Sequence, residues 1–150
     1  MKIILAIDGS NFSKAAVKGL AKMPLPNDSE VNIINIYEYR AMPTSGLHST
    51  KATLYKYPED VIKNAQKIGE KIISEAIKVL KEKNGSLTIT TSIESGLPKK
   101  IILEKAESFD ADLIVVGSQG QGAFSRFLLG SVSQYLATHA KCSVLIVKEK

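Results

Sequence analysis

The chain has 150 residues but only one cysteine, Cys142, and no tryptophan. A single cysteine excludes an internal disulfide and a zinc site built from cysteines. The two histidines are far apart in sequence, so no HxxxH spacing suggests another metal centre. Cys142 stands close to Val144 in an apolar stretch, and we interpret it as a small, half-buried residue rather than a reactive thiol.

Long apolar runs are also lacking. The run nearest the N-terminus, residues 3–7, follows a lysine and ends at Asp8. This run is too short for the core of a signal peptide, and no later run approaches the length of a membrane span. We therefore expect a cytoplasmic protein that does not enter a membrane.

Acidic residues are the minority, with 15 Asp and Glu against 20 Lys and Arg, for a net charge of +5. Many lysines, such as Lys63, Lys67 and Lys71, lie in a segment with helical periodicity, and glutamates such as Glu70 stand among them. This pattern is typical of the solvated face of a helix. No basic cluster is interleaved with aromatic residues for base stacking, so we do not expect nucleic-acid binding.

The sequence shows no set of catalytic residues. Ser10, Ser118 and Ser125 have no identifiable general base, and His48 has no partner in view. His139 falls near the end of the last predicted helix, where a positive charge suits the helix dipole. Neither the lysine-containing P-loop nor a glycine fingerprint after the first strand is present. Catalysis therefore has little support from the residues themselves.

Apolar runs of strand length alternate with helix-like segments along the whole chain, without an internal repeat. The predicted strands are 2–7, 31–37, 87–93, 113–116 and 144–147, and the predicted helices are about 11–23, 59–83, 98–109 and 131–140. This order predicts one α/β domain over residues 1–150, an open parallel sheet with helices on both faces. Ligands of such sheets bind at the carboxyl ends of the strands, where the winding reverses.

The helix predicted over 59–83 has apolar residues at spacings of three and four. We expect these residues to face the core: Val61, Ala65, Ile68, Ile72, Ala76 and Val79.

A glycine-rich loop after the fourth predicted strand is the most distinctive stretch. Gly117 is followed by two residues, Gly120, nine residues and then Gly130-Ser131. Glycines let a backbone approach a ligand closely, and the free N–H groups at a helix start attract anions. We therefore predict phosphate binding here. Ser131 can donate a hydrogen bond to a phosphate or cap the helix, and Ser133 can do either.

Asp8 ends the first predicted strand, as Gly117 ends the fourth. No other strand end carries such obvious polar or glycine-rich chemistry, so these two would share one crevice if their strands were neighbours. Asp8 can accept a hydrogen bond from a nucleobase amine or a ribose hydroxyl, act as an outer metal ligand, or cap the first helix. We favour a functional role, because Ser10 and Asn11 can supply the cap.

Two features of the sequence stay open. Arg126 lies inside the glycine loop, where its side chain can contact phosphate or simply face solvent. The segment 40–58 has no clear periodicity and is longer than an ordinary connection, so it is either mobile or a lid.

The whole chain resembles the universal stress protein family. The matching stretches are 4–10 (ILAIDGS), 34–37 (INIY), 96–98 (GLP), 112–118 (DLIVVGS), 129–133 (LGSVS) and 142–147 (CSVLIV). The spacing of Gly117, Gly120 and Gly130-Ser131 is that of the family's ATP-binding branch. The resemblance implies a Rossmann-like fold of the adenine nucleotide alpha hydrolase type, with five parallel strands in the order 3-2-1-4-5.

The resemblance also implies a bound ATP, with Mg or Mn on its phosphates. The implied nucleotide-binding residues are Ala6, Ile7, Asp8, Ile36, Val116, Gly117, Ser118, Gln119, Gly120, Gly130, Ser131, Val132 and Ser133. Gln119 departs from the histidine or arginine of many members. Family members form homodimers, and the resemblance implies that this chain would pair through residues 144–147. Members of the family act in stress survival and signalling. Because hydrolysis is weak or absent in many of them, a weak ATP hydrolase or phosphotransfer switch is the alternative function.

Overall fold

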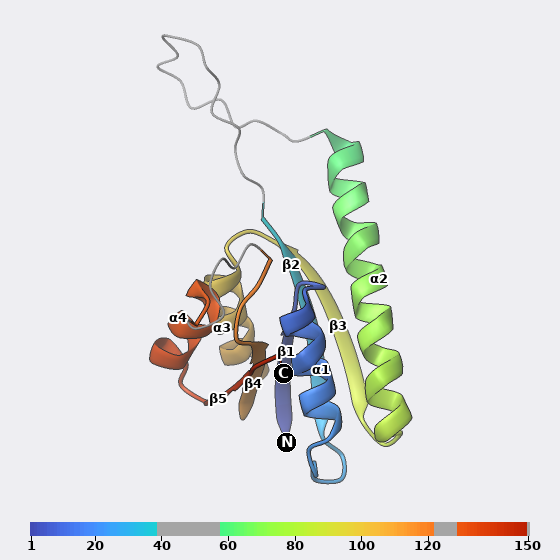
Figure 1. Cartoon of the computed structure of the whole chain (residues 1–150), viewed down its shortest axis with the longest axis vertical. Coiled ribbons are helices and arrows are strands. Elements are labelled where there is room, and N and C mark those ends of the chain that lie inside the picture. The colour runs from blue at the N-terminus through green and yellow to red at the C-terminus, as the bar shows by residue number, and fades with distance from the viewer. Residues whose placement is uncertain (39–57, 122–128, 150) are drawn as a thin grey trace.

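The fold is an open parallel sheet of five strands (Figure 1). A computed structural model describes residues 1–38, 58–121 and 129–149, so His48, Arg126 and nearly all of the segment 40–58 lie outside the described residues. The strands are β1 (Lys2–Ile7), β2 (Glu30–Tyr37), β3 (Thr88–Ser95), β4 (Leu113–Gly117) and β5 (Ser143–Val147). They run in the order β3-β2-β1-β4-β5. The predicted fold class and strand order are confirmed.

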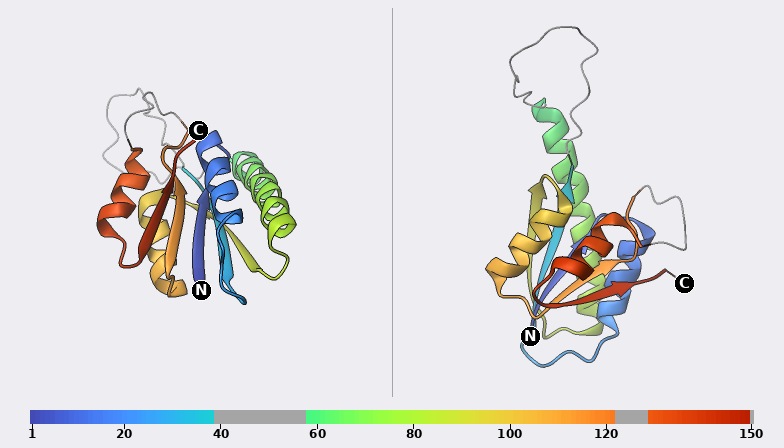
Figure 2. Two further views of the ribbon diagram at one scale, coloured as in Figure 1. Left: turned by 60° about the horizontal axis from the view of Figure 1, so that its bottom comes forward. Right: turned by 90° about the vertical axis from the view of Figure 1, so that its left-hand side faces the viewer.

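Within the described ranges, four helices cover the two faces of this sheet (Figure 2). They are α1 (Asn11–Ala21), α2 (Glu59–Lys83), α3 (Pro98–Phe109) and α4 (Ser131–His139). The helices α1 and α2 pack on one face, and α3 and α4 pack on the other. Because each face is covered, the central strands are apolar on both sides, and the neighbouring Ile3, Ile4 and Leu5 of β1 are all fully buried.

The predicted apolar side of α2 is confirmed in part: Ala76 is buried and Ile72 and Val79 pack against the core, but the first turns do not. Ile68 is 53% exposed and Val61 is 47% exposed, whereas Ile73 and Leu80 are buried. The apolar residues of α2 lie on more than one face of the helix. Periodicity alone therefore could not identify the face that packs against the sheet. In addition, the first turns of α2 extend past the carboxyl end of the sheet, where no strand lies beneath them (Figure 1).

Matched isoleucine truncations in α2 test this correction. Ile73→Ala is expected to lower the free energy of unfolding by about 3 kcal/mol, because it leaves a cavity in the core. Ile68→Ala is expected to change it by less than about 0.5 kcal/mol, as for most exposed sites. Urea denaturation of both variants measures the difference. Equal losses would contradict the packing described for α2.

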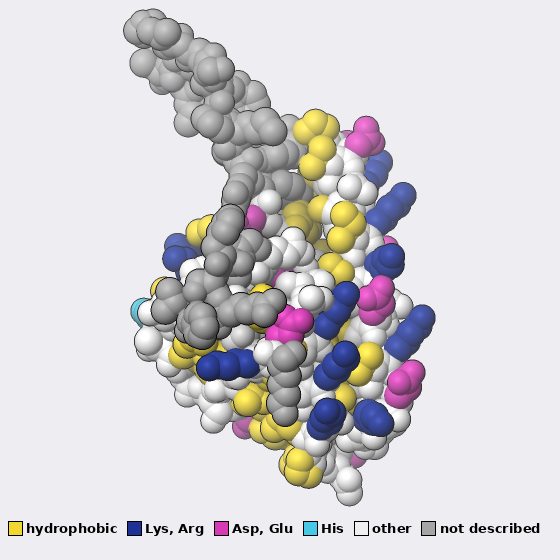
Figure 3. Space-filling model, in the orientation of Figure 1, with side chains coloured by type: hydrophobic (Ala, Val, Ile, Leu, Met, Phe, Trp, Pro, Cys, Tyr) yellow, Lys and Arg dark blue, Asp and Glu magenta, His cyan; other side chains and the backbone are white. Residues whose placement is uncertain are grey.

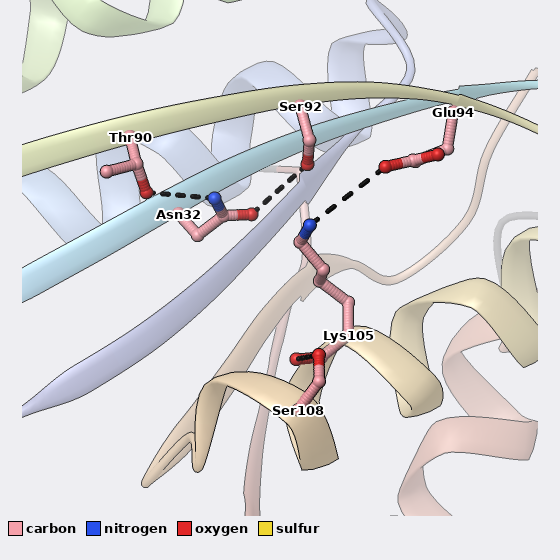
Figure 4. A network of polar contacts seen from close by, with 6 residues as sticks. All are labelled: Asn32, Thr90, Ser92, Glu94, Lys105 and Ser108. Carbon is pink, nitrogen blue, oxygen red and sulfur yellow. Dashed lines mark hydrogen bonds and ion pairs between the residues drawn. The ribbon is translucent and has the colours of Figure 1, made fainter.

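A polar network connects β2 to the edge strand β3 on the face that α3 covers (Figure 4). Asn32 is only 6% exposed, and its amide donates to Thr90 Oγ1 at 2.9 Å. The hydroxyl of Ser92 donates to Asn32 Oδ1 at 3.3 Å. Farther along, Lys105 of α3 pairs with Glu94 at 4.0 Å. The buried amide is thus satisfied, as a polar group in a sheet interior must be.

The charged residues lie on the exposed helix faces. Lysines follow α1 and α2, and acidic side chains are interspersed with those of α2 (Figure 3). The pair Lys63–Glu59, at 3.6 Å, is an exposed i,i+4 pair of the kind expected on such a face. This arrangement fits the predicted solvated surface. None of the helices in the described ranges is long and apolar enough to cross a membrane.

Cys142 is half-buried beside β5, as the sequence predicted. Burial raises the pKa of its thiol above the ordinary value, with a smaller contribution in the same direction from the charge of Asp112. A raised pKa leaves less of the nucleophilic thiolate at neutral pH. The environment of Cys142 therefore favours the structural interpretation over the reactive one.

Candidate functional site

A cavity of about 710 Å³ opens at the carboxyl ends of β1, β2 and β4. Its volume lies within the usual range for small-molecule sites. The cavity brings together all the predicted nucleotide-binding residues except Ser118, which is buried behind it. The strands β1 and β4 are neighbours, so Asp8 and Gly117 reach the same crevice as expected.

Asp8 is held by hydrogen bonds from two separate parts of the chain. Its Oδ1 accepts from the backbone N–H of Ser10 at 3.0 Å and from the Ser10 hydroxyl at 2.6 Å. Its Oδ2 accepts from the backbone N–H of Gln121 at 2.9 Å. The N-cap of α1 is Ser10, whose Oγ accepts from Ser13 N at 3.2 Å. Asp8 therefore supports the cap without being the cap.

These bonds leave Asp8 with a defined remaining capacity. An ionised carboxylate offers about four acceptor positions, and donors from the described residues use three of them. The remaining position is on Oδ2, the oxygen beside Gly120. Asp8 can thus accept one further hydrogen bond from a ligand, which suits a single O–H or N–H donor.

The glycines of the loop are required by close packing. A Cβ placed on Gly117 would lie 2.6 Å from the carbonyl carbon of Phe12, in the first turn of α1. A Cβ on Gly120 would lie 2.9 Å from Asp8 Oδ2. On Gly130 it would lie 3.1 Å from the Cα of Gln119, so the two ends of the loop touch. The glycine pattern therefore lets the loop lie against both β1 and α1.

The start of α4 differs in detail from the prediction. Gly130, not Ser131, is the N-cap, and no side chain caps the helix. The Ser133 hydroxyl is buried, 2.9 Å from the carbonyl oxygens of both Ser118 and Gly130, and has one proton to share between them. The N–H groups of the first turn, 131–133, have no acceptor within the helix and adjoin the cavity. These N–H groups are the anion-binding feature of the site.

An apolar wall of the cavity was not predicted as part of the site. Ala65, Ile68 and Ile72 of α2 line it, as do Pro98 and Ile102 of α3. These α2 residues were expected to face the core, and Ile72 does pack against it as well. Their common helical spacing was visible, but the position of α2 above the strand ends was not. The wall provides a surface for a flat, apolar group.

Asn35 and Gly69 show how closely α2 approaches the sheet at this wall. The amide of Asn35, in β2, donates to the carbonyl oxygen of Ile7 at 2.8 Å. A Cβ on Gly69 of α2 would lie 2.7 Å from Asn35 Oδ1. Asn35 also lines the cavity, so the same side chain joins β1, β2 and the helix that forms the apolar wall.

Charge in the cavity is sparse. The only ionisable side chains among its described lining residues are those of Asp8, Glu38 and Tyr37. Across the described ranges, no three His, Cys, Asp or Glu residues are grouped as a metal site. His139 lies in the last turn of α4, as predicted, with its ring stacked on Tyr135 at 4.0 Å. The described part of the cavity therefore attracts an anion through N–H groups rather than through cationic side chains.

The described lining also offers little for catalysis. It contains no His, Lys or Cys that would activate a water or a serine hydroxyl. The hydroxyl of Ser10 does donate to a carboxylate, that of Asp8, which the sequence analysis had not foreseen. However, Ser10 is not among the residues that line the cavity. The arrangement is suited to holding a ligand.

Comparison with solved structures finds the same fold in other proteins. Universal stress protein UspA from Lactobacillus plantarum matches with a TM-score of 0.70 at 20% identity, over 98% of this chain and 97% of that one. A universal stress protein in complex with cAMP matches with a TM-score of 0.66 at 26% identity, over 99% and 96%. A family protein from Arabidopsis thaliana with AMP bound matches with a TM-score of 0.62 at 19% identity, over 100% and 92%.

Sequence comparison leads to the same group. A relative from Staphylococcus haemolyticus that bears the name universal stress protein is 30% identical over 149 residues, covering 97% of this chain and 83% of the relative. A second, from Staphylococcus saprophyticus, is 28% identical over 149 residues, covering 97% and 82%. The family model named Universal stress protein family matches residues 1–148. Because the family model matches nearly the whole chain and the fold agrees, this chain belongs to the universal stress protein family.

Proposed function

We propose that this chain binds an adenine nucleotide, ATP in the cell, in the cavity at the strand ends. The observation that carries the proposal is the meeting of three features in one cavity: an apolar wall, a carboxylate with one remaining acceptor position, and a glycine loop leading to a helix start. A nucleotide has the matching parts in the same order, namely a flat base, a sugar with hydroxyl donors, and phosphates. The relatives solved with AMP and with cAMP support this choice of ligand.

In the proposed complex the base lies against Ala6, Ile7 and Ile36 and the apolar wall. The phosphates lie along 117–120 and 130–133, where the N–H groups at the start of α4 are directed to anions. Val132 and Val116 line the space between these regions. This placement uses every predicted site residue that reaches the cavity except Asp8.

Asp8 is assigned to the sugar. Its free acceptor position is beside Gly120, in the phosphate-binding loop. The exocyclic amine of adenine is at the end of a nucleotide farthest from its phosphates, whereas the ribose hydroxyls are close to them. A ribose hydroxyl is therefore the donor that best fits Asp8 among the three roles considered from the sequence.

A divalent metal, Mg or Mn, would be bound mainly by the phosphates of ATP. Mg²⁺ commonly binds through substrate phosphates, waters and one or two carboxylates rather than in an all-protein cage. Asp8 has a single acceptor position left, and the described residues offer no further carboxylate next to it at the loop. The metal would neutralise phosphate charge that no described side chain balances.

The proposed role is a nucleotide-dependent regulator in the stress response, working as a cytoplasmic homodimer. The last strand supports the dimer: residues 144–147 of β5 are apolar, form an edge of the sheet and are only half-buried in the single chain. Pairing two such edges would cover this apolar surface. Light scattering after size exclusion tests it, and a monomer at micromolar concentration would contradict the dimer.

The nucleotide released by denaturing the purified protein tests the binding proposal. We expect AMP, ADP or ATP in the supernatant, identified by chromatography and mass spectrometry. The alternative, a weak ATP hydrolase or phosphotransfer switch, predicts ATP turnover above that of a Gly130→Ala/Ser131→Ala double variant. We expect no such difference, because the described lining has no His, Lys or Cys to activate a water, and the Asp8 carboxylate is already held by Ser10 and Gln121.

A further inference from the structure

We propose that Gln121 is a positioning residue that fixes Asp8 for recognition of the sugar and so makes the site selective for ribonucleotides over deoxyribonucleotides. This inference rests on the proposed binding of an adenine nucleotide. Gln121 directly follows the glycine pair of the loop and was not among the residues that the sequence pattern indicated.

Gln121 holds Asp8 at two points. Its backbone N–H donates to Asp8 Oδ2 at 2.9 Å, and its side-chain amide donates to the backbone carbonyl oxygen of Asp8. The two residues are 113 positions apart in the chain. These bonds therefore join the end of β1 to the glycine loop, and they fix both the main chain and the carboxylate of Asp8.

The orientation of the Asp8 carboxylate matters because only one acceptor position is left on it. Ser10 holds Oδ1, and Gln121 holds Oδ2. The torsion angle of an aspartate carboxyl group is otherwise broad and roughly two-fold. Without the hydrogen bond from Gln121, the remaining acceptor position on Oδ2 would therefore point in several directions. Fixing the group before the ligand arrives reduces the ordering cost of binding.

Selectivity follows from the same count of acceptor positions. A ribonucleotide supplies a hydroxyl to Asp8 Oδ2. A nucleotide that lacks this hydroxyl leaves that acceptor position without its donor, which lowers its affinity relative to the ribonucleotide. A fixed Asp8 carboxylate cannot rotate to pair with a different hydrogen-bond donor. Gln121 therefore contributes to discrimination as well as to affinity.

A role limited to stability predicts a different pattern. Gln121 is exposed, so its side chain adds little to the core. A purely structural effect would weaken binding of every nucleotide by the same factor. Only a residue that acts through Asp8 changes the ratio of affinities between ribose and deoxyribose ligands.

The test uses the full chain and calorimetric titration with AMP, 2′-deoxyAMP and 3′-deoxyAMP. For the wild-type protein we expect AMP to bind at least about tenfold more tightly than the weaker of the two deoxy compounds, the effect of one hydrogen bond to a charged acceptor. In Gln121→Met, which keeps the length of the side chain but cannot donate, we expect this ratio to fall to about threefold or less. Gln121→Glu, which puts a carboxylate against the Asp8 carbonyl, should lower it as well.

Gln66→Met is the matched control, because Gln66 is exposed on α2 and does not line the cavity. It should keep the wild-type ratio, and thermal unfolding should show all variants folded. A Gln121→Met protein that keeps the wild-type ratio overturns the inference, whether or not its overall affinity falls. Equal affinity of the wild type for all three compounds also overturns it but leaves nucleotide binding intact. Failure of the wild type to bind any of them overturns the proposed function itself.

Discussion

Replacing Gly117 by alanine is expected to lower the free energy of unfolding by about 3 kcal/mol, the upper part of the usual range for overpacking a tight site. The new methyl group would lie 2.6 Å from the Phe12 carbonyl carbon and 2.7 Å from its oxygen. Backbone atoms at the start of α1 cannot turn away as a flexible side chain can. Either α1 or the glycine loop must shift, so nucleotide affinity should fall together with stability.

Thermal unfolding measures the stability effect of Gly117→Ala, and for a chain of this size we expect a decrease in Tm of roughly 6–12 °C. Gly85→Ala is the matched control, because no atom lies within 4 Å of the position of its Cβ and its φ is not in the left-handed range. Its stability should change by less than about 0.5 kcal/mol. A Gly117→Ala protein as stable as Gly85→Ala would contradict the described packing of the loop on α1.

Asp8→Asn is expected to weaken AMP binding by about 10- to 100-fold, the effect of losing a hydrogen bond to a charged acceptor. The amide keeps one oxygen, but its NH₂ group must face donors, either those of Ser10 or that of Gln121. Stability should also decrease by about 1 kcal/mol, because Ser10 loses part of the support for its cap. Calorimetry and urea denaturation measure the two effects separately.

Asp110→Asn serves as the control for this substitution. Asp110 follows α3 in the left-handed conformation, with φ 54° and ψ 52°, and does not line the nucleotide cavity. Asparagine adopts this conformation as readily as aspartate. We expect AMP affinity within about twofold of the wild type, since exposed substitutions away from a site have small effects. If Asp8→Asn also kept AMP affinity within about twofold of the wild type, the Asp8 carboxylate would not contribute to AMP recognition.

The order of elements could be predicted from the sequence because each strand is a buried apolar run. Strands β1 and β4 are covered on both faces, so they contain few polar residues to obscure the pattern. The bounds of α2 could be predicted because Pro58 precedes it and Asn84-Gly85 follows it. The glycines at 117, 120 and 130 indicated the loop correctly, since each approaches a neighbour closely, and at Gly117 that neighbour is the backbone of α1.

Other features depend on contacts that no local pattern records. The hydrogen bonds between Gln121 and Asp8 join positions 113 residues apart. A glutamine in an exposed loop does not by itself indicate a binding role. The Ser133 hydroxyl was available for a ligand by sequence, but its burial against the carbonyl oxygens of Ser118 and Gly130 became visible only in three dimensions. Val61 and Ile68 of α2 were expected in the core but are exposed, because periodicity does not show where the sheet ends beneath a helix.

The described site suits the proposed binding of a nucleotide better than it suits catalysis. Its anion-binding groups are backbone N–H groups, whose direction is set by the fold and does not depend on a mobile side chain. Its single assigned carboxylate is restrained by Ser10 and Gln121. The proposed regulatory role would require selective, reversible binding of a nucleotide and would not require a general base.

Calorimetric titration of the nucleotide-free protein with ATP and with AMP tests the central claim most directly. The account predicts saturable binding with one nucleotide per chain, at a Kd well below millimolar, together with loss of affinity in Asp8→Asn and in Gly117→Ala. Absence of any heat of binding up to millimolar concentrations of both nucleotides, from a protein that is folded and free of ligand, would contradict it.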